Sequence, residues 1–203
     1  MANGRQGSRA GASLFAACLA IALAIATPTA SAQNWSYFIS PPASLEVIES
    51  DLARQYPDVA NLTPASLSGE LGEGGAEVLL LDVREPGEFA VSRLAGAIQI
   101  EPSARASEVT GIVGDRARGR IVVLYCSVGQ RSSAMARRAQ TALRQAGAVE
   151  VVNLQGGVFA WRNAGLPIVD AKGATPFVHP YNRTWSRYLR RQEFVAYTPR
   201  RSS

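Results

Sequence analysis

The stretch that decides the fold is IVVLYCSVGQRS, residues 121–132. Its first five residues, 121–125, are apolar or aromatic, which is typical of a strand buried on both faces of a parallel sheet. A helical pattern follows over residues 132–146. A strand, a short loop and a helix in this order predict an α/β fold, in which ligands bind where the strands end. We therefore expect residues 126–132 to lie at a ligand-binding edge of the sheet.

Cys126 comes directly after this predicted strand, where a thiol is easily ionised. The backbone N–H groups and the positive dipole end of the following helix both favour a thiolate. Gly129 permits a tight turn that can point successive N–H groups at an anion, and Arg131 adds a fixed positive charge. The alternative is a buried cysteine that only ends a core strand. The glycine and the arginine in the same loop favour a nucleophilic thiolate in an anion pocket.

On both sides of this stretch, apolar β-prone runs alternate with helical patterns. The predicted strands are residues 78–81, 97–100, 121–125 and 149–153. The predicted helices are residues 86–92, 103–118 and 132–146, with another that follows Gly156-Gly157 and ends at Gly165. This alternation predicts one α/β domain, residues 62–170, with a parallel central sheet flanked by helices on both faces.

Residues 33–61 are predicted to be a helical extension ahead of this domain. Apolar residues at helical spacing over 45–52 follow Ser44, which is a suitable N-cap. A second helix is predicted to begin at Pro64, with Thr63 as its cap. We expect both pieces to cover the domain structurally.

Three ordered motifs resemble those of a known family. They are LLLDVREPGEF at residues 79–89, CSVGQRS at residues 126–132, and NLQGGVFAW at residues 153–161 followed by AGLP at 164–167. Together they are similar to the motifs of single-domain rhodaneses, the thiosulfate sulfurtransferase family, and they imply a rhodanese-like fold. One departure is SRLAGA at residues 92–97, where the family usually has GHIPGA.

The resemblance implies a sulfurtransferase reaction at Cys126. Cys126 would take the sulfane sulfur of a small anion such as thiosulfate, become a persulfide, and pass the sulfur to cyanide or a thiol. The persulfide would lie in a cradle of loop residues, with Arg131 binding the anionic part of the donor. The predicted cradle consists of Ser127, Val128, Gly129, Gln130, Arg131 and Ser132. Asp82, Arg84 and Glu88 would form a supporting charge network, and no cofactor or metal would be required.

Two alternatives remain beside this interpretation. Cysteine phosphatases and arsenate reductases on the same fold need five residues between cysteine and arginine, whereas here four separate Cys126 from Arg131. The shorter loop favours a sulfur atom over a tetrahedral phosphate. The other alternative is a non-catalytic sulfur carrier or partner-binding module, but the presence of both Cys126 and Arg131 favours the enzyme.

Residues 1–32 have the pattern of a secretory signal peptide. Arg5 and Arg9 precede an apolar run at residues 14–26, which is too short to span a bilayer. The small residues 30–32 predict cleavage before Gln33. The protein is therefore expected to be exported, to the periplasm or outside the cell, with no membrane span in the mature chain. Cleavage would remove Cys18 and leave Cys126 as the single thiol.

The positive charge of the chain is concentrated in a C-terminal extension, residues 171–203. The whole chain carries +5, whereas residues 33–170 carry −3 and residues 171–203 carry +6. Six of the fifteen aromatic residues lie in this extension, and the spacing of Tyr181, Trp185 and Tyr188 predicts one aromatic helical face. Export argues against nucleic acid as the partner. Two interpretations remain: binding of a protein or an anionic membrane surface, and docking on the domain.

We favour docking for residues 177–189 and expect disorder from about Pro199. His179, the single histidine of the chain, lies outside the predicted domain. We therefore expect it to have a structural or surface role.

Overall fold

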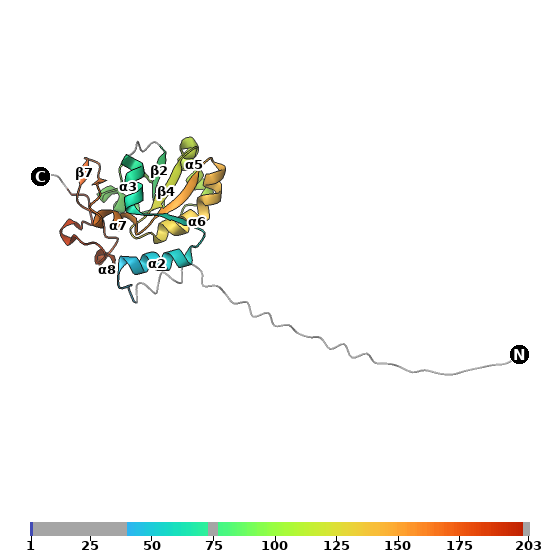
Figure 1. Ribbon diagram of the computed structural model, residues 1–203, viewed down its shortest axis with the longest axis horizontal. Coiled ribbons are helices and arrows are strands. Elements are labelled where there is room, and N and C mark those ends of the chain that lie inside the picture. The colour runs from blue at the N-terminus through green and yellow to red at the C-terminus, as the bar shows by residue number, and fades with distance from the viewer. Residues whose placement is uncertain (2–39, 73–76, 201–203) are drawn as a thin grey trace.

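The computed structural model describes residue 1, residues 40–72 and residues 77–200 (Figure 1). The predicted signal peptide and its cleavage site before Gln33 lie outside these residues, except for Met1. Across the described ranges, no helix combines the length and the apolar character needed to span a bilayer.

A parallel sheet forms the centre of the molecule (Figure 1). The order of its strands is β1-β5-β4-β2-β3, and each neighbouring pair is parallel. The strands are β1 (Ala60–Leu62), β2 (Val78–Asp82), β3 (Ile98–Gln99), β4 (Ile121–Tyr125) and β5 (Glu150–Leu154). The predicted α/β class is therefore confirmed. Because β4 lies between β5 and β2, Cys126 follows a central strand.

Helices flank this sheet, and most begin where the sequence predicts. They are α2 (Leu45–Gln55), α3 (Pro64–Gly72), α4 (Pro86–Val91), α5 (Ala106–Val113), α6 (Gln130–Gln145) and α7 (Gly157–Asn163), with a 3-10 turn at Gly114–Ala117. Ser44 caps α2 by accepting a hydrogen bond from the Val47 N–H, and Thr63 caps α3 through the Ser66 N–H. The long helix predicted at residues 103–118 is instead α5 followed by the 3-10 turn.

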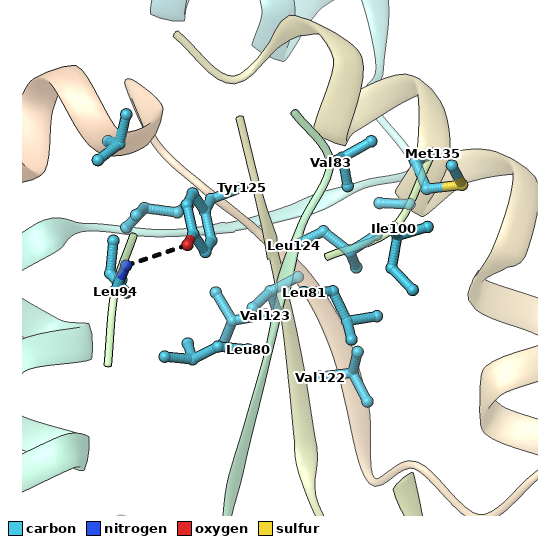
Figure 2. Close-up of a cluster of buried hydrophobic side chains, with 14 of the residues drawn as sticks. Leu80, Leu81, Val83, Leu94, Ile100, Val122, Val123, Leu124, Tyr125 and Met135 are labelled. Carbon is cyan, nitrogen blue, oxygen red and sulfur yellow. Dashed lines mark hydrogen bonds between the residues drawn. The ribbon is translucent and has the colours of Figure 1, made fainter. Parts of the chain in front are cut away.

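Packing on both faces of β4 explains why its sequence is an unbroken run of apolar and aromatic residues. Figure 2 shows Val122 and Leu124 pointing to the side of the sheet where Met135 of α6 lies. Val123 and Tyr125 point to the opposite side, where the Tyr125 hydroxyl accepts a hydrogen bond from the Leu94 N–H at 3.1 Å (Figure 2). Both faces of β4 are thus covered, and alternation of polar and apolar residues is not needed.

The edge strand β1 was not among the predicted strands. It has three residues, of which two are exposed and one half-buried, so it is too short and too exposed to give a buried apolar run. It forms because the backbone of Asn61 pairs in register with that of Asn153 in β5. The sheet therefore begins at Ala60, before residue 62, where the domain was predicted to start.

The C-terminal segment, residues 177–197, differs from its predicted form. It follows a small antiparallel pair, β6 (Ile168–Val169) and β7 (Ala174–Thr175), and contains the short helix α8 (Arg183–Ser186). The predicted aromatic helical face is wrong, because Tyr181 precedes the N-cap of α8 and has a left-handed φ of +68°. Trp185 and Tyr188 are buried, whereas Tyr181 is 42% exposed.

A buried ion pair lies at the carboxyl end of β2. Arg84 donates from Nε to Asp82 Oδ1 at 2.8 Å and from Nη2 to Asp82 Oδ2 at 2.5 Å. Arg84 Nη2 also donates to the Ser92 carbonyl oxygen at 2.6 Å. Both side chains of the pair are fully buried, so each charge depends on the other.

Replacing Asp82 by Asn is expected to lower the free energy of unfolding by about 3–5 kcal/mol, because it leaves the buried Arg84 charge uncompensated. Urea denaturation measures this loss. The matched control is Asp115→Asn, which breaks an exposed pair with Arg118 and is expected to cost less than about 1 kcal/mol. Equal losses in the two variants would contradict the assigned role.

Candidate active site

The Cys126 loop, residues 126–131, consists of the connection after β4 and the first two residues of α6. Cys126 is buried, with 1% of its surface exposed. Gly129 is the N-cap residue of α6 and has a φ of +99°, a left-handed conformation that glycine adopts without strain. This turn brings the Gly129 N–H to Cys126 Sγ, to which it donates a hydrogen bond at 3.3 Å. The loop therefore curls around the sulfur atom.

The surroundings of Cys126 lower the pKa of its thiol. Burial alone raises this pKa, because it disfavours a charged group. The positive charge of Arg131 and hydrogen bonds from Ser132 and Val128 act in the opposite direction and outweigh burial. The position at the N-terminus of α6 favours the thiolate further. Cys126 is thus a buried thiol with the electrostatics of a nucleophile.

The N-terminus of α7 sets the direction in which the Cys126 loop faces. The Val158 N–H donates to the Cys126 carbonyl oxygen at 2.9 Å, and the Phe159 N–H donates to the Ser127 carbonyl oxygen at 3.0 Å. These two carbonyl groups of the loop therefore point to α7, and the N–H groups of the loop remain available to the sulfur. Gly157 makes this approach possible: a Cβ at this position would lie 2.4 Å from the Cys126 carbonyl oxygen.

Arg131 is held in place by Glu88 of α4. Arg131 Nη1 donates to Glu88 Oε2 at 2.7 Å and Nη2 to Glu88 Oε1 at 2.9 Å. The Ser127 hydroxyl also donates to Glu88 Oε1, at 3.0 Å. Burial raises the pKa of Glu88, but the hydrogen bonds and charge of Arg131 outweigh it, so the pKa lies below its ordinary value. Glu88 is therefore ionised and orients both side chains of the loop.

The three residues predicted to support the site divide into two parts. Asp82 and Arg84 form the ion pair at the end of β2, whereas the side-chain partners of Glu88 are Ser127 and Arg131 of the Cys126 loop. Arg84 still acts on Glu88 through its charge, which lowers the pKa of that carboxyl. Glu88 thus contacts the predicted binding residues themselves.

Ser132 and Asn153 anchor the base of the loop. The Ser132 hydroxyl donates to Asn153 Oδ1 at 2.6 Å, and Asn153 Nδ2 donates to Asn61 Oδ1 at 2.8 Å. Asn153 was not predicted as a site residue. Its signal in the sequence is an amide residue among the apolar residues Val151, Val152 and Leu154 of β5.

A cavity of about 120 Å³ opens beside the Cys126 sulfur. The predicted site residues that line this cavity are Cys126, Ser127, Val128, Gln130 and Arg131. Gly129 and Ser132 act on the sulfur through hydrogen bonds without lining the cavity. Within residues 40–72 and 77–200 there is no cluster of three or more His, Cys, Asp or Glu side chains that could hold a metal ion.

The cavity has two further lining residues that were not predicted, Tyr181 and Trp185 of the C-terminal segment. The centre of the Arg131 guanidinium lies 5.0 Å from the centroid of the Tyr181 ring, within range of a cation–π interaction. The aromatic enrichment of residues 171–203 is the one sequence signal that could have pointed to them.

Gly157→Ala is expected to destabilise the protein by about 2–5 kcal/mol, because the backbone here is left-handed, which a Cβ disfavours, and the new Cβ overlaps the loop carbonyls. Thermal or urea unfolding measures the loss, and alkylation of Cys126 reports the loop geometry. Gly87→Ala is the matched control: it lies in α4 with no atom within 4 Å of the new Cβ. If Gly157→Ala were as stable as the wild type, the close packing of α7 against the loop carbonyls would be refuted.

Comparison with known proteins places this geometry in a family. The model of the rhodanese-like domain matches residues 63–164. The chain is 36% identical to a sulfurtransferase of Allochromatium vinosum over 115 residues, which cover 57% of this chain and 99% of that protein. It is 33% identical to the probable adenylyltransferase/sulfurtransferase MoeZ of Mycobacterium tuberculosis over 120 residues, 59% of this chain and 29% of that protein.

A further relative and a solved structure also match over part of their length. An uncharacterized protein of Synechocystis sp. is 37% identical over 97 residues, which are 48% of this chain and about half of that protein. Among solved structures, a thiosulfate sulfurtransferase of Pseudomonas aeruginosa has a TM-score of 0.48 at 16% identity, covering 71% of this chain and 26% of that one. The family match covers half of the sequence and contains the β4–Cys126–α6 unit, and the chain therefore belongs to the family of rhodanese-like domains, in which sulfurtransferases are found.

Proposed function

We propose that this protein transfers sulfane sulfur and that Cys126 carries the sulfur as a persulfide. The observation that carries the proposal is the environment of Cys126 Sγ. The sulfur accepts the Gly129 N–H at 3.3 Å at the N-terminus of α6, and it borders a cavity that Arg131 also lines. A thiolate held by N–H groups beside a cation can attack an anionic donor and then retain a charged persulfide.

In the first step, with thiosulfate as the donor, the Cys126 thiolate attacks the outer sulfur of thiosulfate. A bond forms between Sγ and this sulfur, the S–S bond of thiosulfate breaks, and sulfite leaves with the electron pair. The product is a Cys126 persulfide with one negative charge. The loop N–H groups stabilise this charge as they stabilise the thiolate, and Arg131 binds the sulfonate end of the donor.

In the second step, a thiophilic acceptor attacks the outer sulfur of the persulfide. With cyanide, a carbon–sulfur bond forms, the persulfide bond breaks, and Sγ leaves as the thiolate while thiocyanate departs. A thiolate acceptor would leave as a persulfide in the same way. The cycle balances in atoms and electrons without an external oxidant or reductant, and it returns Cys126 to its starting state.

The geometry of the loop supports sulfur chemistry over phosphate chemistry. Four residues separate Cys126 from Arg131, one fewer than the phosphatase loop needs. The contact of the Gly129 N–H with Sγ leaves the cradle fitted closely to one sulfur atom. Arg131 is further held by two hydrogen bonds to Glu88. A phosphatase or arsenate reductase is therefore the less suitable assignment.

We also propose that the protein is exported, on the basis of the signal-peptide pattern in residues 1–32. Removal of this segment leaves one thiol in an oxidising compartment, where exposed thiols pair with one another. Burial of Cys126 to 1% exposure protects the thiol from other proteins while it remains open to the cavity.

Incubation with thiosulfate is expected to add one sulfur atom to Cys126, and later addition of cyanide is expected to release it as thiocyanate. Peptide mass spectrometry and colorimetric detection of thiocyanate measure the two steps. Cys126→Ser is expected to abolish both. The matched control, made in the chain with residues 1–32 retained, is Cys18→Ser, which alters the other cysteine and is expected to retain both steps.

Two outcomes would contradict the proposal. Absence of the added sulfur on Cys126 would exclude the persulfide mechanism. A persulfide that forms but is not turned over by cyanide or thiols would instead identify a non-catalytic sulfur carrier, the second interpretation of the sequence.

The pH dependence of Cys126 alkylation is expected to shift when Arg131 is replaced by Gln. Thiolate forms as pH rises through the pKa of the thiol, and Arg131 lowers this pKa, so its loss moves the midpoint to higher pH. Iodoacetamide rates between pH 5 and 10 measure the midpoint, with circular dichroism as the test of folding. Arg137→Gln, which removes a charge elsewhere on α6, is the control. An unchanged midpoint in Arg131→Gln would refute the electrostatic role.

A further inference from the structure

The C-terminal segment closes one side of the Cys126 cavity with an aromatic wall, Tyr181 and Trp185. We propose that this wall limits Cys126 to small sulfur donors and acceptors, and that Tyr181 is the residue that sets the limit. The proposal rests on the proposed sulfur transfer for its chemistry. The restriction of access to the thiol can be measured independently of that reaction.

The size of the cavity is the first support. Its volume of about 120 Å³ is several times the roughly 10–15 Å³ that a cavity needs to hold one water molecule. Pockets for drug-sized ligands measure about 300–1,000 Å³. The cavity therefore accepts an anion of a few heavy atoms, and a bulky thiol or a cysteine on a folded protein would require the wall to move.

The wall comes from outside the part of the chain that carries the family match. That match ends at residue 164, whereas Tyr181 and Trp185 follow 17 and 21 residues later. The chemistry and the restriction of access thus have separate origins in the chain. The Cys126 loop provides the nucleophile, and the C-terminal segment determines what reaches it.

The segment is fixed to the domain rather than loosely laid over it. The Tyr188 hydroxyl donates to the Pro42 carbonyl oxygen at 2.7 Å, and Asn163 Nδ2 donates to the Tyr188 carbonyl oxygen at 2.7 Å. Val178 exchanges backbone hydrogen bonds with Phe194 and Ala196, which closes the segment on itself. Trp185 and Tyr188 are buried in this arrangement. The wall therefore has a defined position beside the sulfur.

Tyr181 is held in a conformation that side chains rarely adopt. Its φ of +68° makes it the one non-glycine residue with positive φ in the described part of the chain. Contacts on two sides maintain it: its N–H donates to His179 Nδ1 at 3.0 Å, and its ring lies on Arg131. Strained residues that are held by their surroundings concentrate at functional sites. The conformation places the ring over the anion-binding arginine.

His179 is therefore closer to the site than its sequence position suggests. The hydrogen bond from Tyr181 requires a neutral imidazole, with Nδ1 as the acceptor. Burial lowers the pKa of His179, which favours this neutral form. The expectation of a structural role for His179 agrees with a residue that positions Tyr181.

The test compares the alkylation of Cys126 by a small reagent, iodoacetamide, with that by a polyethylene glycol maleimide. The ratio of the two rates measures access and does not require sulfur transfer. Tyr181→Gly suits the left-handed backbone and removes the ring. It is expected to raise the relative rate of the bulky reagent by at least about tenfold, the lower end of what one methylene contributes in an apolar pocket. Peptide mass spectrometry separates Cys126 from Cys18.

Two further variants make the result specific to the ring. Tyr181→Phe keeps the ring on Arg131 and is expected to retain the discrimination against the bulky reagent. Phe177→Ala removes an aromatic ring of the same segment that packs edge-on against Phe194 and does not line the cavity, and its ratio is expected to equal that of the wild type. An equal rise in Tyr181→Gly and Phe177→Ala, or no rise in either, would overturn the proposal.

Sulfur transfer supplies the second readout. In Tyr181→Gly, kcat/KM is expected to rise for benzenethiosulfonate, a donor with an aromatic ring, relative to thiosulfate. If the wild type forms no thiocyanate but the alkylation ratio of Tyr181→Gly rises as expected, the proposed function is wrong and the restriction of access by the wall is supported. If the wild type is active and neither ratio changes in Tyr181→Gly, the wall is wrong and the proposed function stands.

Discussion

Two hydrogen bonds from the N-terminus of α7 determine the direction of the Cys126 loop, and the chemistry of the site depends on that direction. Val158 and Phe159 bind the carbonyl oxygens of Cys126 and Ser127, so the loop cannot turn these oxygens towards the sulfur. With the carbonyls inward, the same loop would repel a thiolate. Their position behind the loop leaves N–H groups at the sulfur, and the lowered pKa of Cys126 follows from this arrangement together with Arg131.

Arg131 connects three parts of the molecule. Glu88 of α4 binds its guanidinium group, and the ring of Tyr181 in the C-terminal segment lies over that group. Its positive charge lowers the pKa of the Cys126 thiol. Because part of its charge is balanced by Glu88, Arg131 can lower the pKa of the thiol without forming a tight ion pair that would block the sulfur. The side chain is 23% exposed, so it still meets the cavity.

Local sequence patterns predicted the features that depend on near neighbours. The apolar run of β4, the position of Cys126 and the helix after it follow from residues 121–146, and the structure agrees. The strand β1 was missed because only its pairing with β5, about 90 residues away, makes it a strand. Tyr181 was placed on a helical face by its spacing, but its contacts with His179 and Arg131 override that periodicity. Contacts between distant segments have no local signature.

The uneven charge of the chain follows the same division as the loop and the wall. Residues 33–170 carry −3, whereas residues 171–203, which include the wall, carry +6. A cationic segment raises the local concentration of anions at the site it borders, and an aromatic wall excludes the larger ones. The two properties act in the same direction only for small anions. The spacing of its aromatic residues predicted a helical face for the C-terminal segment. On our proposal, the segment instead forms a selective entrance to the Cys126 sulfur.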